Sequence, residues 1–426
     1  MKWIKEFLTK DAFAVVRIDS FRYFLTYRFF MTVATLMQSV IVGWQVYDLT
    51  KSVLSLGMIG LAEVIPQIGI ALFAGHYIDL YDRRKIIIRT TILLLLGSGI
   101  LITYSIPGLN FYALFGIAPI FITIFLSGLV RGILMPAHAA FLGQTVPRNL
   151  LPNAATWNST AWHVAAVVGP AIGGLAYGFF GIVPAYSLVF SFYLVAIIVM
   201  NSTKSVKTEF INSIEQGMLS RIGDGIRYVF KNQILLGAFS LDMFAVFFGG
   251  AVAMLPVFAA DVLKTGPQGL GILRSCPAIG AIIMSIILTF RPPLRRTGYM
   301  LFIATCGFGF CMIGFALSVN FYLSAALLLM SGLFDNVSVV IRGTILQIFT
   351  PDEMRGRVAA VNSIFIGSSN ELGAFESGVA ARLLGLIPSV IFGGTMTLLI
   401  ALTAAKAAPK LRKLSLKDHT TKQVQY

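Results

Sequence analysis

The segment from Pro147 to Pro184 reads PRNLLPNAATWNSTAWHVAAVVGPAIGGLAYGFFGIVP, and 204 residues later the segment from Pro351 to Pro388 reads PDEMRGRVAAVNSIFIGSSNELGAFESGVAARLLGLIP. The two segments align without a gap and are identical at nine of 38 positions, where background composition gives about two or three matches. The chain therefore contains an internal repeat, and its second half is predicted to copy the architecture of its first half.

Both halves are built from long apolar segments. Of the 426 residues, 57% are hydrophobic and 12% are charged, whereas soluble domains carry about 25% charged residues. Apolar runs of about 20 residues, enough to cross about 30 Å of hydrocarbon, recur along the chain. We predict an all-α polytopic membrane protein with twelve transmembrane helices in two six-helix repeats. The predicted spans are 22–48, 54–78, 86–106, 111–146, 151–178, 182–201, 233–260, 268–291, 298–318, 321–349, 355–385 and 388–408.

The basic residues lie mainly between these spans, so the net charge of +15 does not indicate nucleic-acid binding. With the N-terminus inside, 26 of the 33 Lys and Arg residues fall in cytoplasmic segments or at the cytoplasmic ends of the adjoining spans, and the positive-inside rule then places both termini in the cytoplasm. We predict an N-terminal bundle over residues 1–200, a cytoplasmic linker over 201–232, a C-terminal bundle over 233–408 and a basic cytoplasmic tail over 409–426. The three cysteines lie in spans without CxxC spacing, so neither a disulfide, a metal site nor a cofactor is expected.

Charged side chains inside the spans are costly in lipid and should therefore face the bundle interior or an aqueous cavity. They are Arg28, Glu63, Arg131, Asp242, Arg274, Asp335, Arg342, Glu371 and Glu376. Superposing the two halves pairs Arg28 with Asp242, Arg131 with Asp335 and Glu63 with Arg274, and the sign of the charge inverts each time. The alternative interpretation is a set of interhelical ion pairs without a role in transport.

Two motifs lie on or between the helices of the first half. The turn after the second span reads Gly75-His-Tyr-Ile-Asp79-Leu-Tyr-Asp82-Arg83-Arg84-Lys85, and the fifth span contains Gly169-Pro170-Ala-Ile-Gly173-Gly174. Together with twelve spans in two repeats, the first motif resembles the loop motif of the major facilitator superfamily. Leu80 and Asp82 replace its usual basic residue and glycine, a departure that resembles the branch of the enterobactin exporter and macrolide-efflux-like transporters. Further matches are Gly43-Trp44-Gln45-Val46-Tyr47, Arg131-Gly132, Trp157-Asn158-Ser159, Ser240-Leu241-Asp242 and Ser369-Asn370-Glu371-Leu372-Gly373.

The resemblance implies roles for these residues. Helices 1, 4, 7 and 10 line the cavity in the superfamily, so Arg28 and Arg131 would offer an anionic or catecholate-like group two guanidinium partners. Asp242 and Asp335 on the opposite wall would couple transport to protons, because a carboxyl group removed from water ionises less readily. Asp79 would close the cytoplasmic side against helix 11. The small residues of Gly169-Pro170-x-x-Gly173-Gly174 resemble an antiporter motif and would let the two halves seal on one side.

The expected function is proton-coupled efflux of a small amphipathic metabolite, siderophore or drug by alternating access. The chain would act as a monomer in the lipid bilayer of a bacterial inner membrane, with protons as the coupling ion. A uniporter, an importer and a non-transporting receptor are the alternatives. No HExxH, GxSxG or P-loop motif indicates an enzyme.

Overall fold

The computed structural model describes residues 13–203 and 218–417, and within these ranges it contains helices and no strand. Twelve helical segments correspond to the twelve predicted spans, which confirms the predicted all-α fold. In the first half they are α2 (Asp19–Thr50), α3 (Val53–Leu80), α4 (Arg83–Tyr104), α6 (Ala118–Thr145), α7 (Leu151–Phe180) and α8 (Ile182–Asn201). In the second half they are α10 (Gln233–Phe248) with its continuation, α12 (Gly266–Phe290), α13 (Thr297–Leu317), α14 (Phe321–Phe349), α15 (Asp352–Leu384) and α16 (Leu386–Ala407).

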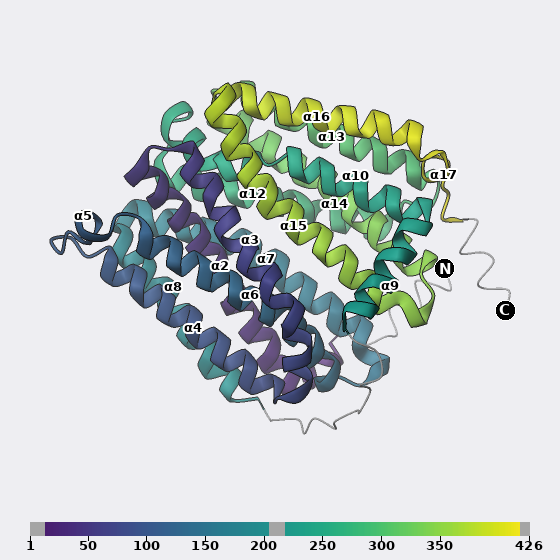
Figure 1. The fold of residues 1–426 in the computed structure, drawn as a ribbon, viewed down its shortest axis with the longest axis horizontal. Coiled ribbons are helices and arrows are strands. Elements are labelled where there is room, and N and C mark those ends of the chain that lie inside the picture. Colours follow the sequence, from purple (N-terminus) through teal and green to yellow (C-terminus); the bar gives the residue numbers. More distant parts are fainter. Residues whose placement is uncertain (1–12, 204–217, 418–426) are drawn as a thin grey trace.

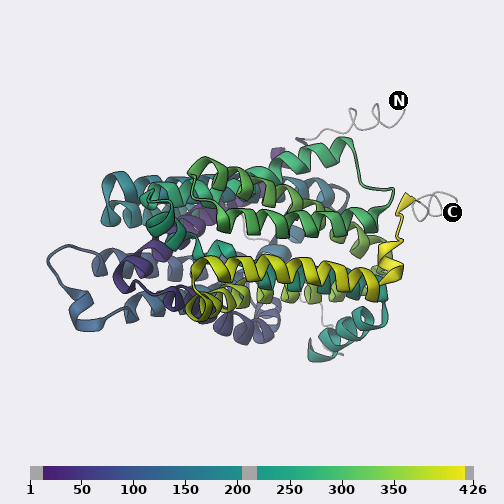
Figure 2. The same cartoon turned by 90° about the horizontal axis from the view of Figure 1, so that it is seen from above.

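The two halves pack their helices in the same way, as the sequence repeat predicts. The pairs α2–α7, α3–α6, α4–α8, α2–α8 and α4–α6 of the first half recur as α10–α15, α12–α14, α13–α16, α10–α16 and α13–α14 in the second. Figure 1 shows the first half, in purple to blue, beside the second half in teal to yellow, and Figure 2 shows the same bundle from above. The halves meet along two pairs of helices, α3 with α15 and α7 with α12.

Two predicted spans are not continuous helices. The predicted helix 111–146 divides into α5 (Phe111–Phe115) and α6, because Gly116 adopts a φ of 53° and Pro119 lies at the start of α6. The predicted helix 233–260 stops at Phe248 before Gly249 and Gly250. It resumes as a 3₁₀ turn (Ala251–Met254), α11 (Leu255–Val257) and a π-helical turn (Phe258–Val262).

Two polar segments at one end of the molecule contain more structure than the sequence predicts. The predicted linker 201–232 includes an amphipathic helix, α9 (Met218–Lys231). In the predicted tail, α17 (Pro409–Arg412) and the residues after it pack against the second half, where Leu411, Leu414 and Leu416 are buried. The backbone of this segment is bonded to the α12–α13 connection, through Gly298 N to Leu414 O at 3.1 Å and Lys417 N to Leu294 O at 3.0 Å.

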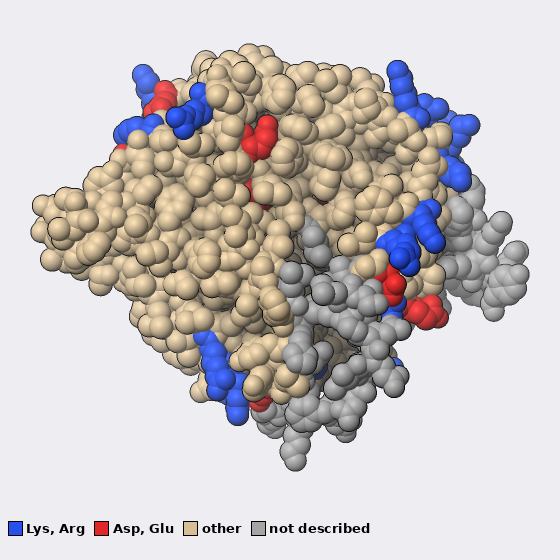
Figure 3. Space-filling model, viewed as in Figure 1, with Lys and Arg blue, Asp and Glu red and all other residues tan. Residues whose placement is uncertain are grey.

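The bundle has two ends, which we name the α5 end and the α9 end after the short helices that lie there (Figure 1). Figure 3 shows Lys and Arg side chains gathered toward the ends, with a broad face between them that carries almost none. Eleven helices of the described residues are long and apolar enough to cross a membrane. The span that fails this criterion is α15, whose second half contains Glu371, Glu376 and Arg382.

Candidate functional site between the two halves

An ion triad joins the two halves inside the bundle. Arg131 on α6 pairs through Nη1 with Glu63 of α3 in its own half, and with Oε1 of Glu371 on α15 of the other half at 3.1 Å. The side chains of both glutamates are 17% exposed. Because charged partners in a low-dielectric interior interact strongly, the triad favours the arrangement in which α3 and α15 lie together.

Glycines bring the three helices of the triad together. A Cβ added at Gly60 of α3 would lie 2.9 Å from the Cβ of Ala374, and one added at Gly128 of α6 would lie 2.8 Å from Pro66 Cγ. On α15 the helical period separates two faces: Glu371 and Ala374 meet α3, whereas Gly373 lies against the backbone of Phe247 on α10. The helix α15 is thus packed closely on both sides.

Arg274 of α12 lies near the triad but is bonded elsewhere. Its Nη1 donates to Ser39 Oγ on α2 at 3.0 Å, and its charge acts on both Glu63 and Glu371. Of the four intramembrane arginines, Arg274 is the one with a buried nitrogen, Nε, that lacks a hydrogen-bond partner among the described residues. Four further buried polar atoms on helices at this interface have no partner within the described ranges. They are Gln38 Oε1, Gln67 Oε1, His163 Nδ1 and Asn362 Oδ1. Buried polar atoms are normally paired, so these are candidates for ligand contacts.

The second half contains a separate buried ion pair. Asp242 Oδ2 on α10 lies 2.6 Å from Arg342 Nη1 on α14, and both side chains are 6% exposed. Arg342 Nε also donates to Ser338 Oγ at 3.3 Å. Asp335 precedes Arg342 by seven residues and therefore lies on the same face of α14. Asp242 and Asp335, which the sequence predicts as two free carboxylates, therefore belong to a cluster that also contains the cation of Arg342.

Arg28 belongs to a third network, which lies within the first half. Its Nη1 lies 2.6 Å from His138 Nδ1, and its Nε donates to Asn158 Oδ1 at 3.2 Å. Arginine can only donate, so His138 Nδ1 accepts and its Nε2 carries the hydrogen. Nε2 then donates to Tyr27 Oη at 3.0 Å, and Tyr27 donates to Thr91 Oγ1 at 3.0 Å. Arg28 and Arg131 therefore do not form the predicted two-arginine site in this conformation.

The loop motif after α3 is partly described. Gly75 and Asp79 belong to the last turns of α3, and the surroundings of Gly75 and the side chain of Asp79 lie outside the described part of the chain. Asp82 caps α4, because its Oδ1 accepts from Arg84 N at 2.9 Å. Arg84 Nη2 binds the carbonyl oxygen of Asn201 and, at 2.9 Å, its Oδ1 at the end of α8. The Asp82 contact is local to α4, whereas the Arg84 contacts join α4 to α8 within the first half. The gating role of this motif stays a prediction.

The antiporter-like motif on α7 lies between the halves. A Cβ at Gly169 would lie 3.0 Å from Val33 O, and one at Gly173 would lie 3.0 Å from Met37 O, both on α2. Gly174 faces the other half, where an added Cβ would lie 2.6 Å from Gly271 Cα of α12, and a Cβ at Gly271 would in turn lie 2.6 Å from Pro170 O. Gly57 of α3 meets Gly378 of α15 similarly, at 2.9 Å from its Cα. Because these contacts lie toward the α5 end, both helix pairs seal the halves there.

The contacts between the halves loosen toward the α9 end. A Cβ at Gly367 of α15 would find Gln67 Nε2 at 3.9 Å, and one at Gly69 of α3 would find no atom within 4 Å among the described residues. Trp162 on α7 is 46% exposed and Phe73 on α3 is 70% exposed. The described helices are therefore joined at the α5 end in this conformation.

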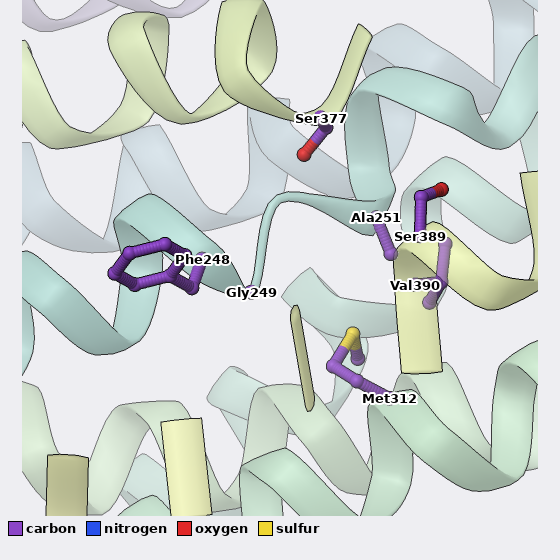
Figure 4. A pocket seen from close by; sticks show the side chains of 7 residues that line it. All are labelled: Phe248, Gly249, Ala251, Met312, Ser377, Ser389 and Val390. Carbon is purple, nitrogen blue, oxygen red and sulfur yellow. The ribbon is translucent and has the colours of Figure 1, made fainter. Parts of the chain in front are cut away.

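A small cavity beside the break in α10 is not the site of a substrate. It is lined by Phe248, Gly249, Ala251, Met312, Ser377, Ser389 and Val390 (Figure 4). Figure 4 shows Ser377 pointing from α15 toward the broken segment. The cavity volume of about 10 Å³ leaves room for a single water molecule.

Several residues of these networks have no transport role that the sequence alone predicts. Arg342 has no counterpart among the three charge pairs that the repeat predicts, although its spacing from Asp335 places both on one helix face. A histidine inside a span, such as His138, is a candidate proton relay, but the hydrogen bond that its Nδ1 accepts from Arg28 makes it a neutral acceptor here. Tyr27 and Thr91 gave no signal, because single hydroxyl groups in apolar spans are common.

Comparisons with known proteins agree with this architecture. The profile of the transmembrane secretion effector family, a major facilitator group, matches residues 10–424. The staphyloferrin A transporter of Staphylococcus aureus is 21% identical, over 93% of this chain and 99% of its own. Macrolide efflux protein A of Streptococcus pyogenes is 20% identical, over 91% and 95%. The multidrug efflux pump Tap of Mycobacterium tuberculosis is 25% identical, over 88% and 89%. A crystal structure of a POT family transporter with 5-aminolevulinic acid aligns with a TM-score of 0.73 at 11% identity, over 92% and 96%.

Proposed function

Because the chain belongs to the transmembrane secretion effector family of major facilitator transporters, which are secondary transporters of small molecules, we propose that it exports a small amphipathic compound in exchange for protons. The three relatives, a siderophore transporter and two efflux pumps, support export of this class of compound. The proposed setting is a bacterial inner membrane with both termini in the cytoplasm, so that the α9 end faces inward. The chain would act there as a monomer, without chemical change to the substrate.

We place the substrate between the halves, beside Arg274. Its Nε and Gln38 Oε1, which have no hydrogen-bond partner among the described residues, lie on α12 and α2, and the hydroxyl of Ser39 lies on α2 as well. These two helices belong to different halves. A guanidinium group and neutral polar groups would bind an anionic or strongly polar part of the compound. Arg28 and Arg131, which the sequence analysis assigned to this role, already have protein partners.

The triad supports the coupling part of the proposal, and it is the observation that carries it. One arginine holds two carboxylates from different halves. A proton on Glu371 would remove one charge and leave Arg131 with Glu63 alone, so the electrostatic attraction between α6 and α15 would weaken. The protonation of Glu371 would therefore change the balance between the open and closed states of the α5 end, which coupling of transport to protons requires.

The experiment is transport into inverted proteoliposomes with an imposed pH gradient, using ethidium, erythromycin and staphyloferrin A as probes. We expect at least one probe to accumulate against its gradient, and we expect nigericin, which dissipates the pH gradient, to abolish accumulation. Equal flux with and without the gradient would identify a uniporter. Saturable binding without flux would identify a receptor.

Gly174→Leu is expected to lower the transport rate about tenfold. The new side chain would press on the backbone of α12 and destabilise the closed state of the α5 end. Overpacking of this kind costs about 1–3 kcal/mol. A cost of about 1.4 kcal/mol changes the population of that state tenfold. The closed state of the α5 end can be measured by electron-paramagnetic-resonance distances between labels at Lys51 and Arg382, which are exposed on different halves.

Gly143→Leu is the matched control, because a Cβ there would meet no described atom within 4 Å. Its transport rate and label distance should stay near those of the unsubstituted protein. A Gly174→Leu variant with an unchanged label distance would show that α7 and α12 do not seal the α5 end.

A further inference from the structure

A basic pocket lies at the α9 end, outside the interface between the halves. It has a volume of about 430 Å³ and is lined by Tyr228, Lys231, Asn232, Gln233, Ile234, Phe349 and Lys410. This volume is within the range of sites for small ligands, about 300–1,000 Å³. The lining contains two lysines and no carboxylate.

The walls of this pocket are held by hydrogen bonds, whereas its lysines are not. Tyr228 Oη donates to Phe349 O at 2.9 Å, Gln233 Nε2 donates to Ala407 O at 3.2 Å, and Asn232 Oδ1 accepts from Ile234 N at 3.0 Å. No ion pair joins Lys231 or Lys410 to a carboxylate in the described part of the chain. Two ammonium groups on different helices, α9 and α17, are thus available to one anion.

The helix that supplies Lys231 has the surface of an interfacial helix. Its inner face is docked on α15, where Gly225 lies close to Arg357 O and Asp224 pairs with Arg357 at 2.9 Å. Its outer face shows two stripes at helical spacing. Ile226 and Phe230 are 41% and 59% exposed, and beside them Arg227 and Lys231 are exposed as well. Adjacent apolar and basic stripes are the signature of a helix lying in the headgroup region of a membrane.

The depth of the pocket matches this interpretation. Phe230 and Lys231 come immediately before α10, so the pocket lies where a membrane span begins. Exposed apolar side chains would be unfavourable in water at this level but would contact the first acyl carbons of a lipid. A phosphate held by the two lysines would lie just above them.

We propose that this pocket binds the headgroup of an anionic phospholipid, with its phosphate on Lys231 and Lys410 and its acyl chains beside Ile226 and Phe230. This lipid would lie in the inner leaflet, an assignment that rests on the orientation given with the proposed function. Because α9 also contacts α3, the lipid would be bound next to a helix that touches both halves.

The test is native mass spectrometry of the full chain in dodecyl maltoside, titrated with phosphatidylglycerol and, separately, with phosphatidylcholine. We expect phosphatidylglycerol to form a saturable adduct with the protein. Phosphatidylcholine should bind the protein at least tenfold more weakly. Lys231→Gln together with Lys410→Gln should weaken phosphatidylglycerol binding about tenfold or more, because each basic residue near anionic lipid contributes about 1 kcal/mol. The matched control is Lys51→Gln with Lys264→Gln at the α5 end, which should leave binding unchanged.

A second arm separates lipid from free phosphate. Phe230→Ser should weaken the phosphatidylglycerol adduct, whereas millimolar inorganic phosphate should displace none of it. Displacement by phosphate together with unchanged binding to Phe230→Ser would assign the pocket to a soluble anion and overturn the lipid proposal. Equal binding of both lipids, or unchanged binding to the double-lysine variant, would overturn it as well. Lipid binding in detergent requires no flux, so failure of the transport experiment alone would leave this result standing.

Discussion

Glu371→Gln is expected to abolish proton-driven accumulation while leaving exchange of substrate at equal pH intact. If one proton is exchanged per substrate, a gradient of one pH unit supports about tenfold accumulation, since one pH unit corresponds to 1.36 kcal/mol. Glutamine cannot release a proton, so the variant should reach a ratio of about one. The measurement is accumulation in proteoliposomes beside counterflow without a pH gradient.

Glu376→Gln serves as the control for this prediction, because it removes a carboxyl group from the same helix, five residues further along α15. It should keep the tenfold accumulation. The assignment of Glu371 would be wrong if its glutamine variant still accumulated substrate. If Glu371→Gln lost exchange as well, the contact between Glu371 and Arg131 would be needed for the change between the open and closed states rather than for proton coupling.

Asp242→Asn is expected to have the largest effect on stability. It would remove the carboxylate that lies 2.6 Å from the buried Arg342 guanidinium, and removing one partner of a buried pair costs about 3–5 kcal/mol. Arg342→Met in the same chain should restore most of this loss, because the unpaired charge is then absent. Denaturant unfolding in micelles of the single and double variants measures both changes.

The double variant also tests whether Asp242 binds the coupling proton, as its position on a cavity helix suggested. A folded Asp242→Asn/Arg342→Met protein that still accumulates substrate would assign the pair to structure alone. Loss of accumulation in that stable background, with exchange intact, would instead return the coupling role to Asp242.

The sequence was sufficient for the fold because its signals are additive along the chain. Apolar length and the 204-residue repeat predicted twelve helices in two matching halves, and all twelve are present. The helix interruptions were missed for local reasons, since the apolar pattern runs unbroken through Gly116 and Gly249. The sequence does not predict α9, because its polar residues make the segment 201–232 resemble a linker.

The sequence was less informative about the site. The repeat identified Arg131 and Asp242 as members of charged networks, but it matched each residue with its counterpart in the other half. Actual partners depend on which helices touch, and Glu63 reaches Arg131 because α3 packs on α6 through Gly128. Pairing across helices is a property of tertiary packing that a single sequence does not carry.

The polarity of α15 has a consequence for biosynthesis. A segment with Glu371 and Glu376 in its second half would partition poorly into lipid when it leaves the ribosome, because a charge near the centre of a helix costs about 2.5–3.5 kcal/mol at the translocon. Gly385 alone separates it from the strongly apolar α16. The two helices would therefore be integrated together as a hairpin, late in synthesis, when α3 and α6 are already in place to receive Glu371.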